Sequence, residues 1–252
     1  MVIHMNKVYE RIIDLSNFVK KYDKVRCLLG LGSVSEKERL DQYSDIDFFL
    51  IVENGYKERF IDQLDWLEVK PLVYTFRNTK DGYKALYHDG VFAEFAVFDE
   101  EEMKTARFTG GTVYYHTDDF DLDLVKPKFE PKHKEINVDF NVNEAMTNLY
   151  IGLLRDLRGE KSSAMTFIQS YAYGLVIELF PKVFKEEKVS VDPYVFERRI
   201  ENRFPNQIEL LSSMRQGVEH NKDSAKNILD FLNAHFNLNQ EFHKHIEILL
   251  TK

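Results

Sequence analysis

The spacing of apolar residues predicts short mixed elements in the first half of the chain. In residues 3–21 a buried helical stripe is formed by Val8, Ile12, Leu15 and Val19. Short apolar runs predict strands at residues 25–31, 45–52, 72–76, 83–87, 91–98 and 113–115. Turns or helices are predicted between them at residues 33–39, at 56–67, and from 99 to a glycine pair at 110–111.

The second half of the chain shows long helical periods instead. Residues 123–136 contain two prolines and four lysines, which is typical of a domain boundary. Helices are predicted beyond it at residues 142–157, 164–180 (ended by Pro181), 196–200, 208–215, 224–236 and 241–250. We therefore predict an α+β protein. A mixed-sheet domain with helices occupies residues 1–125, a linker 126–136, and an all-α helical bundle 137–252.

Two aspartates interrupt the apolar strand at residues 45–52. Alternation places Asp45 and Asp47 on one face of the strand and Ile46 on the other. Two neighbouring carboxylates in an apolar strand repel each other, and a divalent cation such as Mg²⁺ relieves this. The preceding turn, Gly32-Ser33, offers backbone N–H groups to phosphate oxygens. The alternative is an edge strand with solvated aspartates and a helix-capping serine.

An apolar strand, Gly-Ser, about a dozen residues and then Asp-x-Asp resembles the signature of the nucleotidyltransferase superfamily, whose fold is polymerase-beta-like. Residues 41–47, Asp-Gln-Tyr-Ser-Asp-Ile-Asp, are similar to the lincosamide nucleotidyltransferases, relatives of the aminoglycoside enzymes. That group has glutamate as its second acid, whereas this chain has Asp47. The resemblance implies that Asp45 and Asp47 hold Mg²⁺ against the triphosphate of ATP, and that Gly32 and Ser33 contact the phosphates.

Glu94 is the one charged residue between Val91 and Phe98. The resemblance extends to this stretch and implies that Glu94 is the third acid. It would either ligate the metal or take the proton from the substrate hydroxyl, and both roles are physically open. The alternative is a glutamate that points to solvent or pairs with a lysine.

A basic-Gly-Glu turn at residues 158–160 also resembles the lincosamide enzymes. Related enzymes often bind the triphosphate through basic residues of the C-terminal domain, so Arg155, Arg158 and Lys161 are candidates. The alternative is an exposed turn with solvated charges.

Composition narrows the class of partner and the compartment. Asp and Glu number 42 against 34 Lys and Arg, a net charge of −8, which disfavours general nucleic-acid binding. The single cysteine, Cys27, cannot form an internal disulfide. The sequence shows neither a signal peptide nor a membrane-spanning apolar run. Together these features predict a cytoplasmic protein with no membrane partner.

The function predicted is transfer of a nucleoside monophosphate, AMP from ATP, to a hydroxyl of a small molecule. The resemblance makes a lincosamide or aminoglycoside antibiotic the leading acceptor, hence a role in antibiotic resistance, and it allows a homodimer. One alternative is an antitoxin-like nucleotide-binding module that acts on a partner protein. A second is a HEPN-type ribonuclease, because Arg215 and His220 have the Arg-x4-His spacing, although Gly217 and Asn221 suggest a helix end there.

Overall fold

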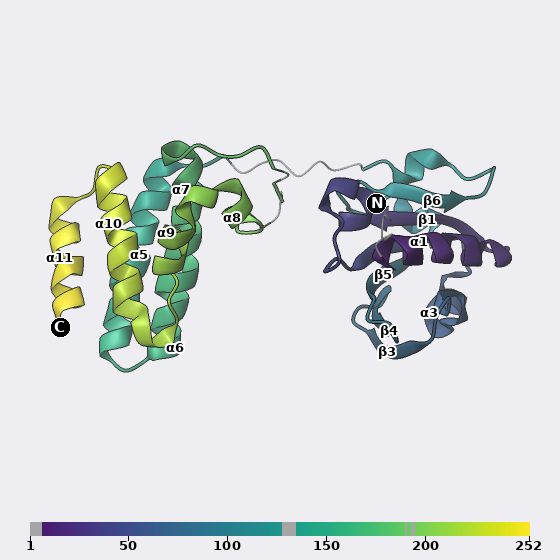
Figure 1. Ribbon diagram of the computed structural model, residues 1–252, viewed down its shortest axis with the longest axis horizontal. Coiled ribbons are helices and arrows are strands. Elements are labelled where there is room, and N and C mark those ends of the chain that lie inside the picture. Colours follow the sequence, from purple (N-terminus) through teal and green to yellow (C-terminus); the bar gives the residue numbers. More distant parts are fainter. Residues whose placement is uncertain (1–6, 128–134, 190, 193–194) are drawn as a thin grey trace, which may run out of the picture. The chain divides into compact units, whose positions relative to one another are not determined.

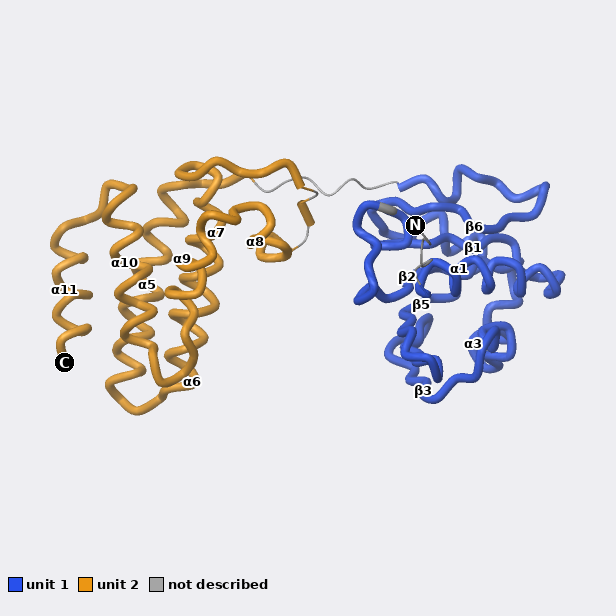
Figure 2. Tube along the Cα trace, viewed as in Figure 1, with its two compact units in different colours: residues 1–130 blue, residues 131–252 orange. Residues whose placement is uncertain are grey.

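The computed structural model describes residues 7–127, 135–189, 191–192 and 195–252. The chain divides into two compact units, residues 1–130 and 131–252 (Figure 2). The division falls within the predicted linker 126–136, of which residues 128–134 lie outside the described residues. Residues 3–6 of the first predicted helix also lie outside them.

Unit 1 is built on a mixed sheet (Figure 1). Its described strands are β1 (Val25–Leu31), β2 (Ile46–Val52), β3 (Leu72–Arg77), β4 (Gly82–Tyr87), β5 (Phe92–Asp99) and β6 (Thr112–His116), in the order β3-β4-β5-β2-β1-β6. β2 and β5 run parallel, and the other neighbouring pairs are antiparallel. The predicted mixed sheet is confirmed, and each predicted strand matches within one or two residues.

The two faces of β2 enter different cores. Phe48 packs on one face with Trp66 and Phe95, in a cluster that also contains the buried stripe of α1 (Lys7–Phe18). Phe49 lies on the opposite face and contacts Phe108 there. Because period-two alternation decides the face, Asp47 shares its face with Phe49.

The helices of unit 1 are shorter than the sequence predicts. They are α1, α2 (Gly32–Ser35), α3 (Lys57–Asp62) and α4 (Glu100–Met103). α3 stops before residue 67 because Trp66 turns into the core, where its indole N–H donates to the Phe60 carbonyl at 2.9 Å. α4 follows Asp99, where the sequence predicts this element to start, and Asp99 and Glu102 form a capping box there; the helix ends at Met103 because Phe108 must reach the sheet.

Unit 2 is helical, as predicted. It comprises α5 (Val138–Leu157), α6 (Lys161–Met165), a π-helical segment (Thr166–Ala172), α7 (Tyr173–Val183), α8 (Ile200–Arg203), α9 (Ile208–Ser213), α10 (Asn221–His235) and α11 (Gln240–Thr251). The fold class, a mixed sheet with helices followed by a helical region, is confirmed. Among the described residues, no helix is both long and apolar enough to cross a membrane.

Two helix predictions in unit 2 are wrong. Pro181 does not end α7, which continues to Val183, because Phe180 and Phe184 pack together and keep this last turn helical. Residues 196–199 form turns, and the helix starts at Ile200. Buried Arg203 explains this start, since it donates to the Phe196 carbonyl and holds that residue outside the helix.

Candidate active site

The turn after β1 brings the backbone close to an aspartate. Gly32 has a φ of +52°, a conformation that favours glycine. A Cβ at Gly32 would lie 2.7 Å from Oδ2 of Asp47, which is closer than such atoms approach. Ser33, next in the turn, donates its hydroxyl to the Asp45 carbonyl at 3.2 Å. The Gly-Ser pair therefore fixes this turn against the start of β2.

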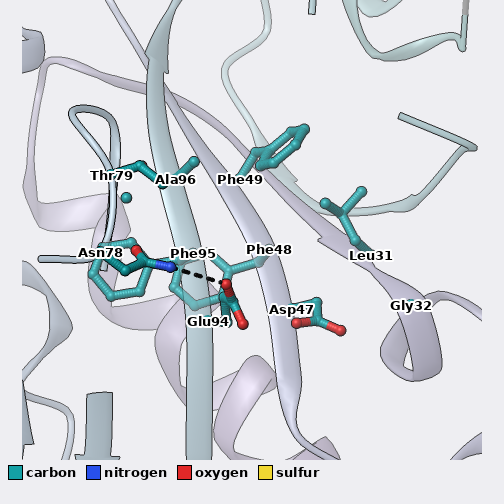
Figure 3. Close-up of a pocket in the computed structure, with 11 residues that line it drawn as sticks. Leu31, Gly32, Asp47, Phe48, Phe49, Asn78, Thr79, Glu94, Phe95 and Ala96 are labelled. Atoms are coloured by element: carbon teal, nitrogen blue, oxygen red, sulfur yellow. Dashed lines mark hydrogen bonds between the residues drawn. The ribbon is translucent and has the colours of Figure 1, made fainter. Parts of the chain in front are cut away.

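Asp47 and Glu94 lie side by side in the sheet. They are directly opposite each other in the parallel β2–β5 pair, so their side chains share one face. Figure 3 shows both carboxylates pointing into the same cleft, which has a volume of about 330 Å³. Gly32 and Asn78 also line this cleft. The structure thus brings together two of the three predicted acids, from strands far apart in sequence.

Glu94 has two polar neighbours that the sequence reasoning missed. The amide nitrogen of Asn78 donates to Oε1 of Glu94 at 3.1 Å, and Nζ of Lys84 lies 3.3 Å from Oε2 (Figure 3 shows the first contact). The alternative that Glu94 pairs with a lysine is therefore realised, although Glu94 itself lines the cleft. Side-chain exposure is 40% for Lys84 and 44% for Glu94, so the ion pair contributes about 1 kcal/mol at most.

A signal for Lys84 was present in the sequence. The predicted hairpin around residues 88–90 pairs position 84 with position 94, as observed. Asn78 comes from the turn between β3 and β4, where no periodic pattern indicates which side chain faces the cleft. Its carbonyl Oδ1 is buried and has no hydrogen-bond partner.

An ion-pair cluster holds the turn that carries Asn78. Nζ of Lys57 lies 2.5 Å from Asp81 and 2.6 Å from Glu102. Burial lowers the pKa of Lys57, but hydrogen bonds to these two carboxylates outweigh burial and hold the pKa above its ordinary value. Lys57 therefore remains charged and fastens the turn to α4.

Asp45 is not brought into the same cleft. It precedes β2, is partly exposed, and is not among the residues that line the cleft. Within the described residues, no group of three His, Cys, Asp or Glu side chains could hold a metal ion. The structure therefore shows a pair of carboxylates, Asp47 and Glu94, in place of the predicted cluster of three.

The carboxylate pair fits Mg²⁺ by its donor chemistry. Mg²⁺ prefers oxygen ligands and is commonly held by one or two carboxylates together with substrate phosphates and water. Asp47 and Glu94 provide two such carboxylates on one face of the sheet. Because residue 32 is a glycine, backbone atoms rather than a side chain lie beside the carboxylate of Asp47.

The basic residues predicted to bind phosphate belong to unit 2 and have other contacts there. Arg155 donates to the hydroxyl of Ser163, and its guanidinium lies 4.1 Å from the centre of the Phe167 ring. Lys161 pairs at 2.9 Å with Asp156, whose side chain is 2% exposed. These two residues stabilise the bundle.

Arg158 is different, because its side chain is 61% exposed and its distance to Glu160 is 3.6 Å. It lies in the turn between α5 and α6, where Gly159 has a φ of +81°. The exposed-turn alternative describes its position.

Arg215 and His220, the pair behind the ribonuclease alternative, do not share a helix. Gly217, with a φ of +97°, separates the end of α9 from the turn before α10. Arg215 pairs with Glu197, and His220 lies 3.0 Å from Asp223. The Arg-x4-His spacing therefore does not place Arg215 and His220 on one face of a helix.

Comparison with known proteins yields structural likeness only. No protein-family model matches this sequence, and no curated protein matches it at a significant level. An aminoglycoside 6-adenyltransferase from Bacillus subtilis aligns with 96% of this chain and 91% of its own, at 14% identity and a TM-score of 0.35. A nucleotidyltransferase-like protein from Exiguobacterium sibiricum aligns with 96% of this chain and 74% of its own, at 11% identity and a TM-score of 0.32.

A spectinomycin adenyltransferase from Enterococcus faecialis aligns with 97% of this chain and 98% of its own, at 13% identity and a TM-score of 0.29. By their names, two of these neighbours are adenyltransferases and one is a nucleotidyltransferase-like protein. Likeness this distant does not by itself assign an activity or a substrate to this chain.

Proposed function

We propose that this chain is a Mg²⁺-dependent nucleotidyltransferase that moves AMP from ATP to a hydroxyl of a small molecule. One observation carries the proposal: Asp47 and Glu94 are register partners that face one cleft, beside a glycine turn that Asp47 touches. A structural role does not account for two carboxylates directly opposite each other and flanked by apolar residues in this parallel pair, since like charges placed together cost stability.

The reaction conserves atoms and charge in one displacement. The acceptor oxygen forms a bond to the α-phosphorus of ATP, the bond from that phosphorus to the bridging oxygen breaks, and pyrophosphate leaves. When bound, Mg²⁺ would neutralise phosphate charge. Asp47 would hold the ion. Glu94 would either accept the proton of the hydroxyl or share the ion, in which case the proton would pass to solvent water.

Residues next to the two acids would position these groups. Asn78 and Lys84 hold the two oxygens of Glu94 and set the orientation of its carboxylate. The backbone at Gly32 and Ser33 would lie nearest the phosphates.

The test is Asp47→Asn in a transfer assay with α-labelled ATP, Mg²⁺ and a panel of lincosamides and aminoglycosides. We expect labelled product from the wild type and a loss of about 100-fold or more in the variant, since charge stabilisation dominates phosphoryl chemistry. The control is Asp62→Asn, whose side chain is 70% exposed at the end of α3. Retained transfer in Asp47→Asn would remove Asp47 from the mechanism, and Mg-ATP binding without any transfer would favour the antitoxin-like alternative.

A further inference from the structure

A row of side chains connects the acidic pair to the edge of the sheet. Asp47 is opposite Glu94, Glu94 is opposite Lys84, and Lys84 is opposite Phe76 of the edge strand β3. Residues directly opposite one another across strands share a face of the sheet. Phe76 therefore lies on the face of the acids, and Tyr74, two residues earlier, shares that face.

Tyr74 and Phe76 are unusually exposed for aromatic residues. Their exposed fractions are 53% and 51%, and they lie on a strand that has a neighbour on one side only. Sequences normally avoid apolar side chains on an exposed edge, because such edges invite aggregation. An exposed apolar surface near a cleft that holds a few polar groups is typical of a ligand-binding surface. We call this pair the aromatic shelf.

The distance from the shelf to the acids sets the size of a ligand that would reach both. Phe76 and Glu94 are separated by one intervening strand, so their backbones lie roughly 10 Å apart at a spacing of about 4.8 Å per strand. A molecule of one or two rings spans that length. Its ring would cover the shelf while a hydroxyl at its other end meets the carboxylate pair.

The charge between the shelf and the acids restricts the ligand further. Lys84 lies there with a side chain that is 40% exposed, so a ligand on the shelf must pass a positive charge. The carboxylates of Asp47 and Glu94 would be committed to the metal and the reacting hydroxyl. A polycation on the shelf would be repelled by Lys84, and no carboxylate in this row would remain to offset that repulsion. An uncharged ring would not be repelled.

We propose that Tyr74 and Phe76 bind the acceptor, and that the acceptor is an uncharged or singly charged hydroxyl compound with a flat or apolar ring face, not a polycation. The inference rests on the proposed function, because the acids define where the hydroxyl must lie. It deepens that function by separating the two predicted antibiotic classes: a polycationic aminoglycoside does not fit the row, whereas a compound with few charges does.

The test measures acceptor binding by saturation-transfer NMR and calorimetry, in the presence of Ca²⁺ and a non-hydrolysable ATP analogue. The probes are lincomycin and p-nitrophenyl β-glucoside, with few charges, against polycationic kanamycin. Phe76→Ala and Tyr74→Ala are compared with Thr75→Ala, an exposed residue of the same strand that is opposite buried Ala85 and so faces the other side. We expect one or both ring probes to bind, and each shelf variant to weaken that binding at least tenfold, with Thr75→Ala within twofold of wild type.

Three results would overturn the inference: tighter binding of kanamycin than of both ring probes, no binding of either ring probe, or ring-probe affinity that the shelf variants leave unchanged. Sedimentation of the same variants addresses another occupant. A wild-type dimer that both shelf substitutions convert to monomer would make the shelf an interface between two copies of this chain and refute its role in acceptor binding. Failure of the proposed function has a different signature, since the wild type would then either bind no metal–nucleotide or bind it without transferring AMP in the labelled-ATP assay.

Discussion

Gly32→Ala tests whether the glycine turn and the acid form one site. The substitution adds a single methyl group 2.7 Å from Oδ2 of Asp47. An ordinary contact begins at 3.4 Å, so the two groups must separate by 3.4 − 2.7 = 0.7 Å. The turn is tied to the start of β2 through Ser33, and we therefore expect the carboxylate of Asp47 to take up the shift.

The size of the effect follows from that displacement. A misplacement of about 1 Å in a reacting group costs about 100-fold in rate, so 0.7 Å should cost tens-fold to 100-fold. Alanine at a positive φ also costs about 1–2 kcal/mol of stability, whatever its surroundings. The two effects must be separated, because a partly unfolded enzyme is also a slower one.

Gly55→Ala provides the matched control. Gly55 has a φ of +85°, and a Cβ there would meet nothing within 4 Å. Both variants should therefore lose a similar free energy of unfolding in urea titrations, of about 1–2 kcal/mol. Only Gly32→Ala should also weaken Mn²⁺ binding and slow AMP transfer, measured at protein concentrations corrected for the folded fraction.

Equal activity in the two folded variants would refute this reasoning. It would mean that Asp47 does not depend on the close approach at Gly32, or that it does not take part in the reaction. A crystal structure of Gly32→Ala with Asp47 in its original position and normal activity would lead to the same conclusion.

Two further predictions concern charges. Lys84→Met removes the cation beside Glu94, so the affinity for Mn²⁺ in the absence of nucleotide should rise several-fold. Water-proton relaxation measures this affinity, and an unchanged or weaker affinity would show that Lys84 does not compete with the metal. Asp89→Asn leaves the guanidinium of Arg11, 3% exposed, without its counterion at 2.6 Å, and should lower the free energy of unfolding by about 3 kcal/mol in urea. Burial raises the pKa of Asp89, but Arg11 outweighs burial and holds this pKa below 3.8. The wild type should therefore exceed the variant in free energy of unfolding by the full amount above about pH 4, and the difference should shrink as the pH falls further. A difference that does not depend on pH would contradict the ion pair.

The face on which Asp47 lies was predicted correctly because it depends on a local rule. Side chains alternate along any strand, so Asp47 and Phe48 had to lie on opposite faces of β2, and the apolar run indicated that Phe48 is the buried one. The buried stripe of α1 follows from helical spacing in the same way. Lys84 was also within reach, since a short hairpin loop sets the register between its two strands.

Features that depend on distant residues could not be read in this way. Phe196 was assigned to a helix by its local pattern, but its carbonyl is held by the buried side chain of Arg203. Residue 78 lies in a turn, where the side chain that faces the cleft is decided by packing against β5. Local propensity is weak in both places, and tertiary contacts outweigh it.

The sequence by itself determined that two apolar strands carry acids and that a glycine turn precedes the first of these strands, as seen at residues 32, 45, 47 and 94. Only the tertiary structure decided that Glu94 lies directly opposite Asp47 while Asp45 stays outside their cleft. The reason is that alternation assigns a side chain to a face, whereas the register of two parallel strands 40 residues or more apart comes from packing of the whole sheet.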